Sequence, residues 1–223
     1  MNKEDLFKDI KAVIFDLDGT LIDSLELWNK IDVEFFKMHN REVPLDYSQK
    51  IAHMNFMEMA VFTHSEYGFK ETPEEIAKIW TDMSLQAYAK DIKTKPYVKE
   101  FLEKLKKANY KIGLVTTSKY SHYEPCLKNN GIWNCFDSDL DVNQINSSKK
   151  EPTCYKLMAS KLGSDIEHTI VFEDILQAIT TAKNAGFRLV AVEDKANKKD
   201  EDKIKKLSDY YLSSYKELLD LNI

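Results

Sequence analysis

A short apolar run that ends in two aspartates constrains the fold of this 223-residue chain more than any other feature. Residues Ala12 to Phe15 are continuously apolar and favour extended backbone, which is the pattern of a strand buried on both faces. A polar segment with a glycine, Asp16 to Thr20, follows directly. Strands buried on both faces belong to parallel sheets covered by helices, so this run predicts an α/β fold.

Further runs of the same character alternate with helical patterns along the chain. The additional strands are predicted at 111–115, 169–172, 188–192 and, more weakly, 210–212, with a short one near 135–136. Helical spacing of apolar residues is found at 98–108, 153–162 and 176–185. In the helix predicted at 153–162, the stripe is formed by Leu157, Met158, Lys161 and Leu162. Strands that alternate with helices of about ten residues predict a Rossmann-like parallel sheet with helices on both faces.

One long segment, residues 24–93, interrupts this alternation. It contains no convincing strand, and its apolar residues, Val33 among them, recur at helical spacing. Thr72 followed by Pro73 and two glutamates is typical of a helix N-terminus. The segment is therefore predicted to be a small all-helical domain, inserted into a catalytic core formed by residues 1–23 and 94–223.

Composition excludes several classes of protein. The formal net charge of −5 argues against a general nucleic-acid binder, which needs a basic excess, and the Lys-rich stretch 195–206 is interleaved with acids and predicted to be a solvated face. No apolar run approaches the roughly 18 residues of a membrane span, and residues 1–11 lack the apolar region of a signal peptide. We therefore expect a cytoplasmic protein, a monomer or weak dimer, whose three cysteines are free, buried thiols.

Polar side chains follow three of the predicted strands. Because ligands of open parallel sheets bind at the carboxyl ends of the strands, these residues are candidates for a common site. They comprise Asp16, Asp18 and Thr20 after the first strand, Thr116, Thr117 and Ser118 after the second, Glu173 and Asp174 after the third, and Lys149 and Lys150 before the helix leading to the third.

This set of groups suits phosphoryl transfer through an acyl phosphate. A carboxylate that attacks phosphorus forms a mixed anhydride, and a divalent cation, most naturally Mg²⁺, must bridge the two anionic groups. Thr116, backbone amides and Lys149 can supply hydrogen bonds and positive charge to the transition state. Asp18 can protonate the leaving oxygen and later deprotonate the attacking water.

Four motifs in this order resemble those of the haloacid dehalogenase-like hydrolase superfamily. They are Phe15 to Ser24, Leu114 to Ser118, Lys149 to Pro152, and Val171 to Asp174 with its continuation at 182–186. The resemblance covers essentially the whole chain. The inserted helical segment is similar to the cap domain of the subfamily that includes phosphoglycolate phosphatase and beta-phosphoglucomutase.

The resemblance implies a role for each carboxylate. Asp16 would be the nucleophile and a magnesium ligand. Asp18 would be the general acid/base and would give its backbone carbonyl to the metal. Asp174 would bind magnesium, and Glu173 would help to place the metal's waters and the catalytic lysine.

The resemblance also implies the phosphate-binding groups. Thr116 and the amide of Thr117 would hold the phosphoryl group, and Lys149 would neutralise it and orient Asp16. Lys150 stands where the family usually has proline, so either lysine could be the catalytic one; the spacing to Pro152 favours Lys149. A further departure is Ile175, which replaces a common serine and so removes a hydroxyl that could support Asp174.

The substrate depends on the inserted domain. Its segment 50–56 lacks the arginine with which sugar-phosphate mutases of this family grip a second phosphate, and the only arginines of the chain are Arg41 and Arg188. His53 lies in that segment and is a candidate for contact with substrate. We therefore expect a phosphatase acting on a small phosphate ester. The alternatives are a sugar phosphomutase of the beta-phosphoglucomutase type and a non-catalytic phosphate-binding regulatory module.

Overall fold

The computed structural model describes residues 2–24, 26–51, 54, 56–145 and 147–223. The chain forms two compact units. The first consists of Met1–Leu25 and Ile92–Ile223, and the second of Glu26–Asp91. The predicted insertion, residues 24–93, has bounds that differ from those of the second unit by two residues at each end.

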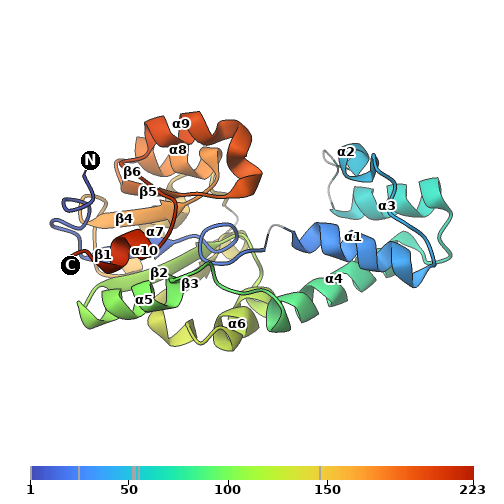
Figure 1. The fold of residues 1–223 in the computed structure, drawn as a ribbon, viewed down its shortest axis with the longest axis horizontal. Coiled ribbons are helices and arrows are strands. Elements are labelled where there is room, and N and C mark those ends of the chain that lie inside the picture. The colour runs from blue at the N-terminus through green and yellow to red at the C-terminus, as the bar shows by residue number, and fades with distance from the viewer. Residues whose placement is uncertain (1, 25, 52–53, 55, 146) are drawn as a thin grey trace. The chain divides into compact units, whose positions relative to one another are not determined.

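The first unit is built on a parallel sheet of six strands in the order β3-β2-β1-β4-β5-β6 (Figure 1). The strands are β1 Ala12–Phe15, β2 Lys111–Thr116, β3 Ser138–Asp141, β4 Thr169–Glu173, β5 Arg188–Val192 and β6 Tyr210–Leu212. β1 is central because its Ala-Val-Ile-Phe sequence is fully buried and pairs in parallel with both β2 and β4. The prediction of a Rossmann-like α/β fold is confirmed.

Helices connect the strands and form the second unit. In the first unit these are α5 Val98–Lys107, α6 Tyr120–Asn129, η1 Trp133–Cys135, η2 Val142–Ile145, α7 Thr153–Lys161, α8 Leu176–Asn184, η3 Lys195–Asp200, α9 Glu201–Leu207 and α10 Lys216–Leu219. The second unit contains α1 Leu27–Met38, α2 Tyr47–Ile51, α3 Phe56–Tyr67 and α4 Pro73–Lys90. No helix in the described ranges is long and apolar enough to cross a membrane.

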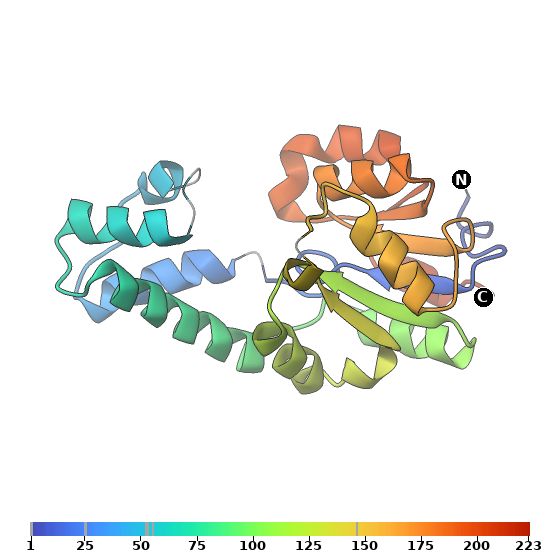
Figure 2. The ribbon, with the colours of Figure 1, turned by 180° about the vertical axis from the view of Figure 1, so that it is seen from behind.

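One face of the sheet is covered by α7, α8 and α9, which Figure 2 shows from the other side of the molecule. Met158 of α7 and Ile179 of α8 belong to the same buried cluster as Ile14 of β1. Gly113 in β2 allows the close approach of α7, because a Cβ there would lie 2.6 Å from the sulfur of Met158. Burial of this cluster is the main source of stability for the sheet.

The opposite face is covered by aromatic side chains from α5 and the segment before α10. The ring of Phe101 lies edge-on to Phe15 of β1, and Tyr215 stacks on Phe172 of β4 with centroids 6.2 Å apart. These side chains are fully buried or nearly so. Both faces of the central strands are therefore closed, and only the strand ends remain available for a site.

The predicted short strand near 135–136 is wrong in position. Residues Trp133–Cys135 form a 3₁₀ turn, and the edge strand is Ser138–Asp141. Its sequence, Ser-Asp-Leu-Asp, can be polar because an edge strand pairs on one side only, and the first two of its residues are only partly buried. The apolar run that identifies a central strand is absent from it.

The predicted face of α7 is also partly wrong. Lys161 is exposed, whereas the buried residues of the helix are Cys154, Tyr155, Met158 and Ala159. The sheet selects this face because Met158 must lie over Gly113, and the other residues follow from the helical period. The three cysteines are free and buried, as predicted.

Within the second unit, an aromatic cluster holds the helices together. Phe35 of α1 contacts Phe69 and Trp80, with ring centroids 5.0 and 5.6 Å apart. Val33 does not contribute, contrary to its predicted position on the apolar stripe, because it is 52% exposed. α4 begins as predicted, with Thr72 and Glu75 forming a reciprocal capping box.

The two segments that join the units pair with each other inside the first unit. The amide of Asp23 donates to the carbonyl of Lys93 at 3.0 Å, and the amide of Lys95 donates to the carbonyl of Leu21 at 2.9 Å. This pairing fixes the loop that follows β1, since the outgoing segment is its direct continuation.

Candidate active site

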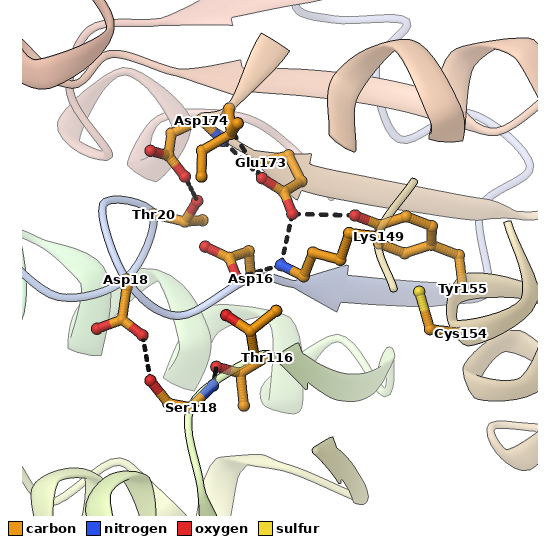
Figure 3. Close-up of polar contacts among 12 residues, drawn as sticks. Asp16, Asp18, Thr20, Thr116, Ser118, Lys149, Cys154, Tyr155, Glu173 and Asp174 are labelled. Atoms are coloured by element: carbon orange, nitrogen blue, oxygen red, sulfur yellow. Dashed lines mark hydrogen bonds and ion pairs between the residues drawn. The ribbon is translucent and has the colours of Figure 1, made fainter. Parts of the chain in front are cut away.

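The carboxyl ends of β1, β2 and β4 bring the predicted site residues together. Asp16 follows β1 directly, and its amide donates to the carbonyl of Phe172 at 3.0 Å, so the β1–β4 pairing continues into the site. Thr116 ends β2 and Glu173 ends β4. Figure 3 shows these side chains grouped around Asp16 at this edge of the sheet.

Three buried carboxylates form the centre of the site. Asp16, Glu173 and Asp174 each have an oxygen within 4.8 Å of the others, and none of these residues is more than 5% exposed. Burial raises the pKa of Asp16 from 3.8 to about 7, although Lys149 acts in the opposite direction. Burial and the neighbouring negative charges of Asp16 and Glu173 raise the pKa of Asp174 well above its usual range. Burial and mutual repulsion thus disfavour the charged forms of these carboxylates when no cation is bound.

Lys149 provides the positive charge next to this cluster. Its ammonium forms ion pairs with Asp16 and, at 2.5 Å, with Glu173 (Figure 3). Burial alone would lower the pKa of Lys149, but the two carboxylates outweigh it and raise the pKa. Lys150 is exposed, and its amide donates to the hydroxyl of Ser148. Of the two lysines that the sequence leaves open, only Lys149 contacts the carboxylates.

Both oxygens of Glu173 are engaged by other groups of the protein. Oε1 accepts hydrogen bonds from Lys149 and, at 2.9 Å, from the hydroxyl of Tyr155 on α7. Oε2 accepts from the backbone amides of Asp174 at 3.1 Å and Ile175 at 3.4 Å. This arrangement suits a carboxylate that orients Lys149 better than one that binds a metal directly.

Asp174 is held by two neutral donors. The hydroxyl of Thr20 donates to Oδ1 at 3.1 Å, and the side-chain amide of Asn197, on η3, donates to Oδ2 at 2.8 Å. Ile175, which replaces the expected serine, is half exposed. Gly19 packs its backbone against the same carboxylate, with a φ of +84°, and a Cβ there would lie 2.4 Å from Oδ2. The glycine of the Asp-x-Asp-Gly motif is therefore required by space as well as by backbone conformation.

Asp18 lies on the loop after β1. Its carboxylate accepts hydrogen bonds from the hydroxyls of Ser24 and Ser118, each at 2.7 Å. These two donors come from the outgoing connection and from the loop after β2. They hold the side chain next to, but separate from, the three-carboxylate cluster (Figure 3).

The loop after β2 is organised by its own side chains. Thr116 is fully buried, and its Oγ1 accepts a hydrogen bond from the amide of Ser118 at 2.9 Å. Thr117 is exposed, and its carbonyl accepts from the side chain of Asn143 at 2.7 Å. Asp141 accepts from the same asparagine at 2.8 Å. The turn is thereby fixed at the point where the resemblance places a phosphoryl group.

His53 lies outside the described residues. Sequence reasoning missed three contacting residues: Tyr155, Asn143 and Asn197. Asn197 could have been found, because it follows the carboxyl end of β5 and the rule that points to the other strand ends applies there too. Tyr155 and Asn143 carry no local signal, since their contacts depend on how α7 and β3 pack on the sheet.

The donor set fits a hard divalent cation. Oxygen ligands at the end of a strand, buried and with excess negative charge, suit Mg²⁺, which prefers carboxylates and retains several waters. Burial is the main cause of the raised pKa of Asp16, and the negative charges of Glu173 and Asp18 raise it further. Asp16, Glu173 and Asp174 are the described residues whose carboxylate oxygens lie close enough together that they could hold such an ion.

The chain is similar to known phosphatases in sequence and to a solved structure in fold. It is 27% identical over 185 residues to the pyrophosphatase PpaX of Bacillus velezensis, covering 83% of this chain and 84% of that protein. It is 24% identical over 181 residues to the phosphorylated carbohydrates phosphatase of Thermotoga maritima, covering 81% and 84%. The crystal structure of a "putative beta-phosphoglucomutase" from Thermotoga maritima superposes with a TM-score of 0.84 at 24% identity, covering 95% and 97% of the two chains.

A family model decides the assignment. The model of the haloacid dehalogenase-like hydrolases matches residues 13–192, which include the strand ends that carry Asp16, Thr116 and Asp174, together with Lys149. This range also contains the whole of the second unit. The protein is therefore an enzyme that belongs to the haloacid dehalogenase-like hydrolase family.

Proposed function

We propose that this enzyme is a magnesium-dependent phosphatase that hydrolyses a small phosphate monoester through an aspartyl-phosphate on Asp16. The observation that carries the proposal is the position of the Asp16 carboxylate at the end of β1. It is buried, paired with the ammonium of Lys149 and adjacent to Glu173 and Asp174. A nucleophilic carboxylate needs a cation to keep it ionised and further positive charge to accept a phosphoryl group beside it.

In the first step, an oxygen of Asp16 attacks phosphorus and the bond from phosphorus to the ester oxygen breaks. Asp18 in its protonated form gives its proton to the leaving oxygen, so the alcohol departs neutral. Lys149 and the hydroxyl of Thr116 donate hydrogen bonds to the phosphoryl oxygens. Glu173 and Tyr155 keep the ammonium of Lys149 in place during this step.

In the second step, a water attacks phosphorus and loses its proton to Asp18, which is now the base. The bond from phosphorus to the Asp16 oxygen breaks, and inorganic phosphate and the free carboxylate result. Ser24 and Ser118 hold the Asp18 carboxylate by hydrogen bonds before and after the proton transfer.

Asp16, Asp174 and the backbone carbonyl of Asp18 would hold Mg²⁺. The ion supplies charge that offsets the repulsion between the carboxylate nucleophile and the anionic substrate. Glu173, whose oxygens are already engaged, would act on Lys149 and on waters of the ion.

The substrate class follows from the relatives and from the charges of the second unit. Named relatives act on pyrophosphate and on phosphorylated carbohydrates. The helical unit, Glu26–Asp91, would serve as the cap that selects the leaving group. Its segment 50–56 lacks an arginine for a second phosphate, which favours hydrolysis over the phosphomutase alternative suggested by the fold neighbour.

Phosphate release from a panel of small phosphomonoesters and pyrophosphate, with and without Mg²⁺, tests the proposal. Release is expected only with the ion and is expected to be lost in Asp16→Asn, which keeps the side-chain shape. Isomerisation of a hexose phosphate in the presence of a bisphosphate activator, without net phosphate release, would instead establish the mutase. Release that persists unchanged in Asp16→Asn would contradict the nucleophile assignment.

A further inference from the structure

Asn197 lies outside the four sequence motifs and yet contacts the carboxylate that the proposed function gives to the metal. Its side-chain amide donates to Oδ2 of Asp174 at 2.8 Å, across a separation of 23 residues. Asn197 is half-buried and belongs to η3, the 3₁₀ helix that follows β5. It therefore reaches the site from a part of the sheet edge that carries no other assigned residue.

The asparagine is held in position by its own loop. The backbone amide of Asn197 donates to the carbonyl of Asp194 at 3.1 Å. The Asp194 side chain caps η3 by accepting from the backbone amide of Ala196 at 2.9 Å. The buried second oxygen of Asp194 accepts from the ammonium of Lys95 at 2.9 Å, and the same ammonium donates to the carbonyl of Glu193 at 2.7 Å. These four contacts fix the start of η3, so Asn197 meets Asp174 in a preformed position.

The chemical type of the residue matters because the cluster is negative. Asp174 is 1% exposed and lies beside Asp16 and Glu173, so its buried carboxylate oxygens need hydrogen-bond donors. An amide supplies one without positive charge, whereas a lysine or arginine at the same place would form an ion pair and compete with a cation. Thr20 donates to the other oxygen and is also neutral. Both donors orient the carboxylate without placing a second cation against it.

We propose that Asn197 is a positioning residue that sets the affinity of the enzyme for Mg²⁺ by holding the Asp174 carboxylate in a fixed orientation. The proposal rests on the magnesium site of the proposed function. It adds a residue from the β5–η3 connection to that site. Because Asn197 acts through Asp174, its removal affects the metal requirement and leaves the chemistry of the fully loaded enzyme nearly unchanged.

The test is the dissociation constant of Mg²⁺, measured by calorimetric titration of the whole protein in the absence of substrate. Asn197→Ala is expected to weaken binding by about 10–100-fold, the usual effect of losing a partner of a metal ligand. The Mg²⁺ concentration for half-maximal phosphate release should rise in parallel, with kcat at saturating Mg²⁺ within about threefold of wild type. Asn197→Lys should weaken binding further than Asn197→Ala, because its ammonium competes for Asp174.

Lys199→Ala is the matched control, since Lys199 is an exposed residue of the same 3₁₀ helix. Its dissociation constant should equal that of wild type. Circular dichroism and the urea midpoint without Mg²⁺ verify that each variant is folded. Should Asn197→Ala fail to fold, Asn197→Ser, which keeps a shorter neutral donor, takes its place and is expected to bind more weakly than wild type.

The outcomes separate this inference from the function on which it rests. An unchanged Mg²⁺ affinity in Asn197→Ala, or a loss of kcat at saturating Mg²⁺ with unchanged affinity, overturns the role of Asn197 while the wild type remains a magnesium enzyme. A wild type that neither binds Mg²⁺ nor requires it overturns the proposed function itself. Weaker binding in Asn197→Ala together with unchanged binding in Lys199→Ala supports the inference.

Discussion

At the scale of single residues, two adjacent lysines of the site have different surroundings. Lys149 forms ion pairs with Asp16 and Glu173, whereas the next residue, Lys150, is exposed. The sequence motif places both within one position of the expected lysine. Their different surroundings follow from the turn before α7, which directs one side chain toward the sheet edge and the other into solvent.

We predict that Lys149→Ala and Lys150→Ala have very different effects on turnover. Loss of Lys149 removes the cation beside the nucleophile and should lower kcat/KM by about 10²–10³-fold, the usual effect of removing one transition-state donor. Lys150→Ala removes the same charge from an exposed position and should change kcat/KM by less than about threefold. Steady-state kinetics of both variants checks this, and comparable losses in the two would refute the assignment.

We predict that Asp16, although it is needed for catalysis, lowers the stability of the metal-free protein at neutral and higher pH. Because burial raises the pKa of Asp16 from 3.8 to about 7, the folded state holds its proton more tightly than the unfolded state does. The stability from this group is present below pH 3.8 and is lost as pH rises to about 7.

Asp16→Asn removes that penalty. In EDTA at pH 8 the variant should be more stable than wild type by at least about 1 kcal/mol, and the difference should shrink toward pH 5. Urea unfolding at the two pH values measures it. A variant less stable than wild type at pH 8 would mean that the ion pair with Lys149 outweighs the burial of the carboxylate.

The elements that carry the site are predictable in proportion to how much apolar sequence they contain. β1 is a continuous apolar run, and β4 and β5 each have an apolar centre that is buried on both faces; the sequence locates all three strands to within a residue. β3, an edge strand with the sequence Ser-Asp-Leu-Asp, lacks this pattern, and its predicted position is wrong. That strand forms because it pairs with β2, and the pattern of residues within the segment does not predict such pairing.

The same limit explains which site residues escape sequence reasoning. Asp16, Asp18 and Asp174 follow apolar strands, so the position of each is evident from its neighbours. Asn197 lies in a Lys-rich stretch that the sequence predicts to be a solvated face, and most of that stretch is indeed exposed or half exposed. Its one functional contact is with a residue 23 positions away, which only the packing of η3 against the sheet edge provides.

At the scale of an element, we predict that the loop after β1 does not tolerate a side chain at Gly19. In Gly19→Ala the new methyl group would meet the Asp174 carboxylate at 2.4 Å, and the alanine would have to adopt a positive φ. Stability should fall by more than about 1–2 kcal/mol, the cost of the left-handed backbone alone, and Mg²⁺ affinity should fall with it.

Gly163→Ala provides the comparison, because Gly163 has a φ of +68° and no atom lies within 4 Å of the position that a Cβ would occupy there. The free energy of unfolding of Gly163→Ala should fall only by the cost of the left-handed backbone, and its Mg²⁺ affinity should stay that of wild type. Urea unfolding and calorimetric titration of both variants separate the two effects. Equal losses of stability with unchanged Mg²⁺ affinity in both would show that the contact with Asp174 is unimportant.

At the scale of the whole molecule, the parallel sheet is what converts distant residues into one site. Asp16, Lys149 and Asp174 are far apart in the sequence. The order β3-β2-β1-β4-β5-β6 places β1 and β4, which precede Asp16 and Asp174, side by side, and Lys149 reaches them from the segment between β3 and α7. The apolar side chains of both sheet faces fix those strands, so the burial that stabilises the fold also buries the carboxylates. The raised pKa values of Asp16 and Asp174 are consequences of the same packing.

The central claim is that Asp16 carries the phosphoryl group during turnover, and covalent trapping tests it most directly. The enzyme is mixed with Mg²⁺ and its best phosphate ester, quenched in acid within one turnover, digested and analysed by mass spectrometry. The account predicts an acid-stable, alkali-labile phosphoryl group on Asp16, absent without substrate and in Asp16→Asn. A phosphoryl group on another residue, or rapid phosphate release with no covalent species at any quench time, would contradict it.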